Sequence, residues 1–147
     1  MRKSYLGEIP NPEVRDFQRK KLYYAEALCS FWNEPPVLSR PKVKTLVTDI
    51  TEWADIHVPS ISYDASKNGR VAYATASSLV LPFPLSKSVP FICHEMSHVI
   101  NYQRGPADHH GPNFATAYLE VVNTFIGKEE YEELKTSFDN FKVKYRK

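Results

Sequence analysis

The chain has 147 residues, of which 42% are hydrophobic and 24% charged, and its formal net charge is +2, a composition typical of one globular domain spanning residues 1–147. The charge is too small to indicate a nucleic-acid-binding protein, and no apolar run approaches the ~20 residues that cross a bilayer. Because Cys29 and Cys93 cannot build a disulfide framework and residues 1–5 lack the apolar core of a signal peptide, we expect a cytoplasmic, intracellular protein without membrane contact.

The first third of the chain is predicted to be helical. Asn11-Pro12-Glu13 is typical of a helix start, with a capping side chain, a proline at the first position and an acid in the first turn. This helix should end before Pro35, and its apolar residues are Val14, Phe17, Leu22, Ala25, Leu28 and Phe31. A second helix should follow Pro41, because apolar residues recur there at helical spacing: Val43, Leu46, Val47, Ile50, Trp53 and Ala54.

The middle of the chain changes to a strand pattern. Residues 58–63 are rich in β-branched side chains, and segments 71–75 and 78–81 are further predicted strands. Ser66-Lys67-Asn68-Gly69 is a strong turn signal. We therefore expect a small antiparallel sheet.

Helices return after this region. Ser88 can cap a helix that runs to about Tyr102. Pro112 should begin another helix that Gly127 can terminate, and a last helix should start near Glu129. The predicted order of elements is that of an α+β domain whose small sheet packs on helices.

The segment His94-Glu95-Met96-Ser97-His98 carries the strongest functional signal. Two histidines four residues apart on a helix point the same way from adjacent turns, and imidazole is a preferred ligand of Zn²⁺. Glu95 can act as general base on a water molecule that the ion activates. Apolar flanking residues indicate a buried helix, which favours metal ligands over two unrelated surface histidines. The pattern predicts a zinc-dependent hydrolase with Glu95 as its catalytic residue.

A catalytic zinc normally takes a third protein ligand, and three downstream residues are candidates. His110 lies just before a predicted helix, where a loop can return it to the site. Its neighbour His109 could substitute, but adjacent side chains in a loop rarely face the same point. Glu120 lies off the apolar stripe of its predicted helix and should face solvent. The predicted metal ligands are therefore His94, His98 and His110.

These motifs resemble those of the SprT-like, or Spartan-type, zinc metallopeptidases, whose pattern is HExxH, a short loop and then HGxxF. The second motif is here His110-Gly111-Pro112-Asn113-Phe114. The resemblance implies a zincin-like fold, a peptide or protein substrate, Glu95 as the base and a zinc ion held by His94, His98 and His110. The chain lacks the four-cysteine zinc ribbon and the room for a DNA-binding domain that often follow this core, so crosslink repair is not implied.

A wider resemblance connects nearly the whole chain to a less characterised family of metallohydrolases from actinobacteria and their phages. It is carried by the segment RDFQRKKLYYAE at residues 15–26, by HExxH, and by HGxxF followed by Tyr118-Leu119-Glu120. The resemblance implies a hydrolase encoded by such a bacterium or phage.

Secondary roles around the metal helix follow from the same fold analogy. In zincin folds an edge strand beside the metal helix binds extended substrate, and segment 71–75 or 78–81 would be that edge. Tyr102 and Arg104 follow the second histidine and could stabilise an oxyanion, although surface positions at a helix end are the simpler interpretation. His57 is expected to be structural or exposed.

Two other functions remain compatible with the sequence. The basic clusters Arg19-Lys20-Lys21 and Lys142, Lys144, Arg146 and Lys147 should be solvated faces, but they could make a weak nucleic-acid contact. The main alternative is therefore a metal-containing SprT-like binding module for DNA or a protein partner, without proteolytic activity. A structural zinc site is the third possibility, and it requires Glu120 or Asp108 as a fourth ligand.

Overall fold

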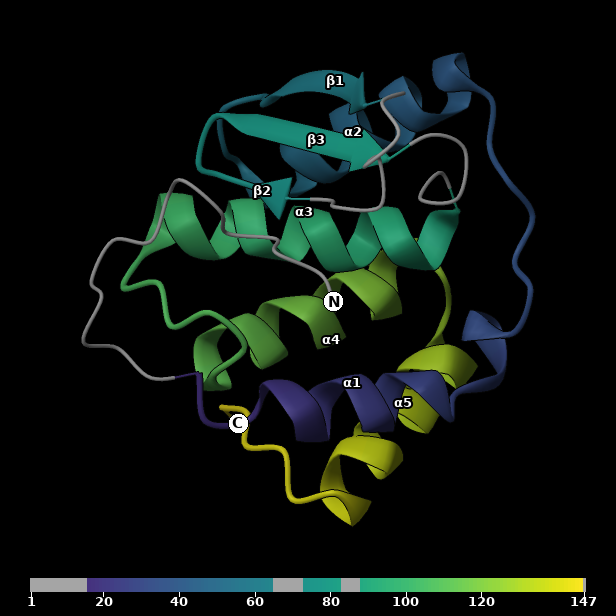
Figure 1. The fold of residues 1–147 in the computed structure, drawn as a ribbon, viewed down its shortest axis with the longest axis vertical. Coiled ribbons are helices and arrows are strands. Elements are labelled where there is room, and N and C mark those ends of the chain that lie inside the picture. The colour runs from purple at the N-terminus through teal and green to yellow at the C-terminus, as the bar shows by residue number, and fades with distance from the viewer. Residues whose placement is uncertain (1–15, 65–72, 83–87, 147) are drawn as a thin grey trace.

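The computed structural model describes residues 16–64, 73–82 and 88–146, and these residues form an α+β domain. A small sheet lies at one end of the molecule, with α2 (Arg40–Ala54) behind it and α3 (Val89–Arg104) beneath it (Figure 1). α4 (Pro112–Phe125) packs against the other side of α3. α1 (Arg19–Ala27) and α5 (Lys128–Asn140) lie together at the far end.

The sheet contains β1 (Ser60–Asp64), β2 (Tyr73–Ala74) and β3 (Ser78–Pro82), in the order β1-β3-β2. β3 pairs antiparallel with β2 but parallel with β1, so the prediction of an antiparallel sheet is wrong for one pairing. β3 carries the buried Leu79 and Leu81 and occupies the centre, where strands on both edges cover it. Segment 78–81 is therefore not an edge, whereas β2, within segment 71–75, is one.

A tight turn at residues 75–78 joins β2 to β3. The N–H of Thr75 donates to the carbonyl of Ser78 (2.8 Å). The Thr75 hydroxyl accepts hydrogen bonds from the N–H groups of Ser77 (3.2 Å) and Ser78 (2.9 Å). Hydroxyl groups that bond the local backbone thus stabilise this turn without glycine or proline. The turn predicted at residues 66–69 lies outside the described residues.

The first helix is shorter than the sequence predicts. Its expected start at Asn11 lies outside the described residues, and α1 ends at Ala27, followed by the 3-10 turn η1 (Ser30–Trp32). Phe17 lies before α1 and Leu28 after it, and these two side chains are 78% and 69% exposed. Of the apolar residues predicted for this segment, Leu22 and Ala25 are fully buried, and both lie in α1.

The predicted metal helix, α3, begins at its predicted cap. The Ser88 hydroxyl accepts a hydrogen bond from the N–H of Phe91 (3.4 Å), and the helix extends to Arg104, slightly beyond the predicted end. Gly105 then adopts a φ of 54°, in the left-handed region that favours glycine. Residues 92–101 are all buried, because α3 contacts α2 and the sheet on one side and α4 on the other.

The remaining helices start close to their predicted positions. Ser39 caps α2, accepting a hydrogen bond from the N–H of Lys42 (3.3 Å). α4 begins at Pro112 as predicted, and α5 begins at Lys128, one residue before the predicted start. Gly127 lies in the short link between α4 and α5.

Two buried apolar clusters lie on either side of α4. One fills the space between the sheet, α2, α3 and α4, and the other lies among α1, α4 and α5. Val121 belongs to the first cluster and Phe114 to the second, so α4 joins the two halves of the molecule. Cys29 and Cys93 are free and buried, and burial raises the pKa of each thiol to about 12, as expected for cysteines that act as small hydrophobes. Among the described helices, none combines the length and apolarity needed to cross a membrane.

Candidate metal centre

α3 provides His94 and His98 on adjacent turns. Their exposed fractions are 0% and 1%, and their ring centroids lie 5.2 Å apart. The four-residue spacing on a helix is the cause of this proximity. Both imidazoles therefore face the same interior region between α3 and α4.

His110 reaches this region from the loop between α3 and α4, and Asp108 fixes that loop. The Asp108 carboxylate accepts hydrogen bonds from the N–H groups of Asn113 (2.7 Å) and Phe114 (3.1 Å) in the first turn of α4. It also accepts one from the side-chain amide of Asn101 on α3 (3.0 Å). Asp108 is thus a helix cap that ties the two ends of the loop together.

Gly111 permits this close approach of the Asp108 side chain. A Cβ at Gly111 would lie 2.8 Å from Cγ of Asp108, closer than real contacts allow. His109 adopts a φ of 59°, so the backbone turns sharply just before His110. His110 joins the other two histidines, and among the described residues His109 does not.

The structure brings the three predicted ligands together. His94, His98 and His110 each offer one ligand atom, and these atoms all lie within 4.8 Å of one another. The ring of His110 lies 4.7 Å from that of His98 and 5.6 Å from that of His94, measured between centroids. Glu120 is exposed, as predicted, and is not part of this cluster. We call these three residues the histidine cluster.

A buried carboxylate on α1 orients His94. Oε2 of Glu26 lies 2.8 Å from Nδ1 of His94, and Glu26 itself is only 3% exposed. The same oxygen accepts a hydrogen bond from the Tyr118 hydroxyl (2.8 Å), which in turn accepts one from the indole N–H of Trp32 (2.8 Å). The ring of His94 is therefore held by a chain of hydrogen bonds that connects α1, η1, α4 and α3.

A second carboxylate orients His110. Asp16, just before α1, places Oδ2 2.8 Å from Nδ1 of His110 and accepts a hydrogen bond from the His110 N–H through Oδ1 (3.2 Å). Burial alone raises the pKa of Asp16, but the hydrogen bonds and the charge interaction with His110 outweigh it, and the pKa lies below its ordinary value. Asp16 is thus a carboxylate and can only accept hydrogen bonds.

These contacts place a carboxylate beside Nδ1 of two imidazoles. Because a carboxylate accepts hydrogen bonds, Nδ1 of His94 and Nδ1 of His110 face an acceptor for their protons. With an ion bound, Nε2 of each ring would be the ligand atom. Metal-binding histidines usually donate their other N–H group to a carboxylate in this way, and three imidazole nitrogens are a known donor set of catalytic zinc. The donor set of the histidine cluster therefore fits a zinc ion.

Aromatic rings surround the histidine cluster. Phe114 stacks on His98 with ring centroids 4.2 Å apart and an angle of 25° between the ring planes. It also lies 5.1 Å from the rings of both His94 and His110. Phe114 is the last residue of the HGxxF motif, so this motif supplies one histidine and the apolar wall behind all three.

Tyr23 of α1 brings a hydroxyl group close to a ligand atom of the cluster. Its hydroxyl oxygen lies 3.2 Å from Nε2 of His110, the ligand atom of that ring. Its ring centroid lies 5.0 Å from that of His110 and 6.0 Å from that of His94. Tyr23 is half-buried, whereas the three histidines are fully buried.

The other residues singled out in the sequence have different environments. Glu95 is 0% exposed, in the same turn of α3 as His94. Tyr102 is half-buried in the last turn of α3. The Arg104 guanidinium donates to the carbonyl of Ala54 at the end of α2 (2.9 Å), which places it in a structural contact between helices. His57 is exposed, as expected.

Sequence reasoning from the metal helix missed the residues that the α1 region contributes. Asp16, Tyr23 and Glu26 all lie in the segment that carries the wider resemblance, but the motifs of the metal helix give them no role. On the helix predicted from Asn11, their spacing of seven and three residues would place polar side chains on one face, and this is the signal that could have found them. The polar contact of the buried Tyr118 was missed as well, because its helical spacing indicates only a core position.

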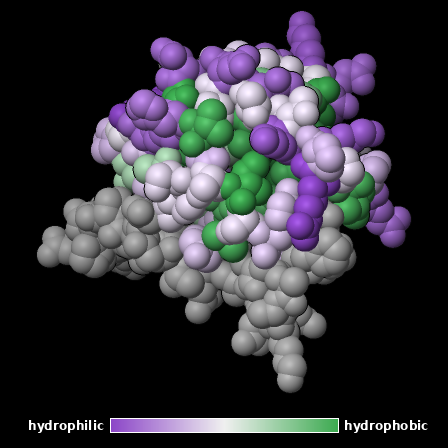
Figure 2. Space-filling model, turned by 90° about the horizontal axis from the view of Figure 1, so that it is seen from above, coloured by the Kyte–Doolittle hydropathy of each residue, from purple (hydrophilic) through white to green (hydrophobic). Residues whose placement is uncertain are grey.

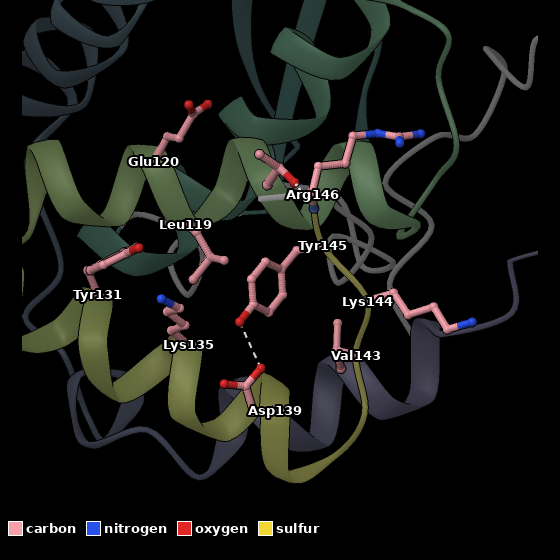
Figure 3. A pocket seen from close by; sticks show the side chains of 10 residues that line it. Leu119, Glu120, Tyr131, Lys135, Asp139, Val143, Lys144, Tyr145 and Arg146 are labelled. Carbon is pink, nitrogen blue, oxygen red and sulfur yellow. Dashed lines mark hydrogen bonds between the residues drawn. The ribbon is translucent and has the colours of Figure 1, made fainter.

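Surface hollows also lie apart from the histidine cluster. Figure 2 views the molecule from the sheet end and shows apolar side chains gathered in the middle of that face, with hydrophilic ones around them. A hollow of about 600 Å³ lies between α2 and β1, with Val47, Val58 and Ile61 in its lining. A larger one, about 1120 Å³, lies among α4, α5 and the C-terminal segment, where Tyr145 donates to Asp139 (2.7 Å; Figure 3). Neither lining includes a histidine of the cluster.

No protein-family model matches this chain, and no curated protein or solved structure is significantly similar to it. The resemblance to SprT-like peptidases therefore rests on the motif residues, and the zincin-like fold stays a prediction.

Proposed function

We propose that this chain is a zinc-dependent hydrolase, specifically a metallopeptidase that cleaves peptide bonds. The observation that carries the proposal is the histidine cluster, with two of its three buried imidazoles backed by carboxylates. Three protein ligands leave one position of a tetrahedral ion for water or substrate, as catalytic sites require. Among the described residues, Asp108 caps α4 and Glu120 is exposed, which supports a catalytic over a structural zinc site.

Each residue then has a defined role. His94, His98 and His110 hold the ion, while Glu26 and Asp16 keep the proton on Nδ1 of two of these rings. When bound, the ion supplies a Lewis acid that polarises the peptide carbonyl and lowers the pKa of water. Glu95 accepts the proton of the attacking water and passes it to the leaving amine. The burial of Glu95 strengthens its electrostatic interactions, because the local dielectric constant is low.

The test combines metal analysis with cleavage of an unfolded protein such as denatured casein. We expect one zinc per chain and cleavage that a chelator abolishes. Glu95→Gln should keep the zinc and lose activity by about 10²–10⁴-fold, the usual contribution of a general base. His110→Ala should lose most of the zinc affinity. The matched control is Glu120→Gln, at an exposed position of α4, which should change neither the zinc content nor the cleavage activity.

Two results would contradict this proposal. Full hydrolytic activity of Glu95→Gln would show that the assigned base is wrong. Zinc bound at one equivalent, with no cleavage of any peptide or unfolded protein, would argue against a peptidase and for a binding module.

One structural observation favours that second function. The amino group of Lys21 donates to the carbonyl of Lys142 (3.2 Å), and the Gln18 side chain exchanges two hydrogen bonds with the Lys144 backbone (2.9 and 2.8 Å). Lys142 and Lys144 of one basic cluster therefore lie beside the start of α1, which carries the other (Figure 1). Binding of single-stranded DNA that weakens with added salt would support a nucleic-acid role, and absence of binding at low salt would remove it.

A further inference from the structure

We infer that the Tyr23 hydroxyl is the hydrogen-bond donor that stabilises the substrate carbonyl oxygen in this site, an inference that rests on the proposed hydrolase function. Tyr23 lies on α1, one turn before Glu26, and its hydroxyl oxygen is 3.2 Å from Nε2 of His110. No sequence motif assigns a role to this residue. Its position is defined by two other contacts of the α1 region at the same site, those of Asp16 and Glu26.

The contact with Asp16 leaves Nε2 of His110 facing Tyr23. The Asp16 carboxylate lies 2.8 Å from Nδ1 of the ring, so Nε2 is the nitrogen left for an ion. The Tyr23 hydroxyl lies 3.2 Å from this same nitrogen. A phenolic hydroxyl can donate as well as accept, so Tyr23 can offer a proton beside the reaction centre.

When an ion takes the lone pair of His110, that nitrogen can no longer accept from Tyr23, and the hydroxyl can donate to an oxygen of the substrate. The substrate carbonyl oxygen is the acceptor that hydrolysis provides, and it gains negative charge as water attacks the carbonyl carbon. Tyr23 is half-buried beside three fully buried histidines, so it lies between the ligands and the exterior from which a substrate arrives.

The contacts of Arg104, one of the two residues that the sequence suggests for this role, agree with this assignment. Its guanidinium is held by the carbonyl of Ala54 at the end of α2. Tyr23 is in direct contact with a predicted metal ligand. A competing role for Tyr23 is that of a fourth metal ligand, and the two roles predict opposite effects on zinc affinity.

The first measurement is zinc affinity, by competition with a chelating dye, for the wild type, Tyr23→Phe and Tyr24→Phe. Tyr24 is the matched control, because it is the next residue of α1 and is 63% exposed. Tyr23→Phe should bind zinc as well as the wild type or up to about tenfold more tightly, because one hydrogen bond to His110 no longer has to break. A loss of affinity greater than tenfold would identify Tyr23 as a ligand and overturn the donor role.

The second measurement is the binding of acetohydroxamate to the Co²⁺-substituted protein, followed by visible absorption. This small probe carries a carbonyl oxygen that can accept the Tyr23 hydrogen bond. Its affinity should fall about tenfold in Tyr23→Phe and stay unchanged in Tyr24→Phe. Equal affinity in all three proteins would overturn the inference. If Tyr23→Phe is not folded, Tyr23→Leu removes the same donor and is compared in the same way.

Kinetics then separate the inference from the proposed function. With a cleaved substrate, Tyr23→Phe should lower kcat by about 10²–10³-fold with little change in KM. If the wild type cleaves substrate and Tyr23→Phe cleaves it equally well, the Tyr23 inference fails and the hydrolase proposal stands. If the wild type binds zinc but cleaves nothing, the hydrolase proposal fails, and so does the role of Tyr23 in it.

Discussion

Glu26 affects the candidate metal centre through one histidine that it contacts. Its Oε2 atom holds the Nδ1 proton of His94 and also accepts from Tyr118. A carboxylate in this position raises the basicity of the ring and fixes its orientation, and losing such a partner typically lowers metal affinity 10–100-fold. We therefore expect Glu26 to have a large effect on zinc affinity for a residue that is not a ligand.

The corresponding prediction is that Glu26→Gln weakens zinc binding by about 10–100-fold without preventing folding. Competition with a chelating dye measures the affinity. The control is Glu133→Gln, since this glutamate also accepts two hydrogen bonds, from the N–H (2.9 Å) and hydroxyl (2.8 Å) of Ser30, away from the histidine cluster. Equal zinc affinity in Glu26→Gln and the wild type would show that the carboxylate is not needed.

At the residue scale, the sequence predicted which three histidines come together but not their carboxylate partners. His94 and His98 could be predicted because a local helical spacing brings them together, and His110 because a short loop follows. Glu26 and Asp16 could not, because they precede their histidine partners by 68 and 94 residues. Only packing of α1 against α4 and α5 places them there, and no local pattern encodes that packing.

At the scale of elements, the loop between α3 and α4 is the part on which the site depends most. Asp108 joins its two ends through Asn101 on α3 and the first turn of α4, and Gly111 leaves room for that carboxylate. The cap thus performs two functions, starting α4 and holding His110 in place. Stability and metal affinity should therefore change together when the cap is removed.

We predict that Asp108→Ala lowers the free energy of unfolding by about 1–2 kcal/mol, the usual cost of losing a helix cap, and also weakens zinc binding. Thermal or denaturant unfolding measures the first effect and dye competition the second. Asp49→Ala, on the exposed face of α2, is the control and should leave both unchanged. A variant that lost the cap but kept wild-type zinc affinity would show that His110 is positioned by other contacts.

The elements themselves were predicted to different degrees. α2, α4 and α5 start at or close to their predicted positions, and α3 starts at its predicted cap, because proline, capping side chains and apolar stripes act locally. The sheet pairing was partly wrong, since β1 pairs with β3 in parallel and not with its neighbour in the sequence. Which strands pair depends on how each strand packs against the rest of the molecule. Short strands have too few residues for their hydrophobic pattern to reveal that packing.

For the whole molecule, the histidine cluster connects the two halves of the structure. Two of its histidines lie on α3, which packs under the sheet. The carboxylates that contact its histidines come from the α1 region, which packs with α5 at the far end (Figure 1). A ligand that binds only the folded state stabilises it by mass action. Zinc should therefore stabilise the whole domain and not only the loop that carries His110.

The prediction is that zinc at 100 times its Kd raises the free energy of unfolding by about 2.7 kcal/mol. Differential scanning fluorimetry with and without a chelator measures the resulting change in Tm. The change should disappear in His110→Ala and persist in His57→Ala, an exposed histidine outside the cluster. An unchanged Tm in the wild type at saturating zinc would argue against a folded-state metal site.

The contacts of α1 also have a consequence for the order in which the protein is made. The α1 region is synthesised before its partners at the site, His94, His110 and Tyr118, which follow 68 to 94 residues later. Gln18 also bonds the Lys144 backbone, 126 residues further along the chain. A growing chain therefore cannot complete the histidine cluster until His110 has been synthesised. The proposed peptidase would thus have no assembled site while that part of the chain is still missing on the ribosome.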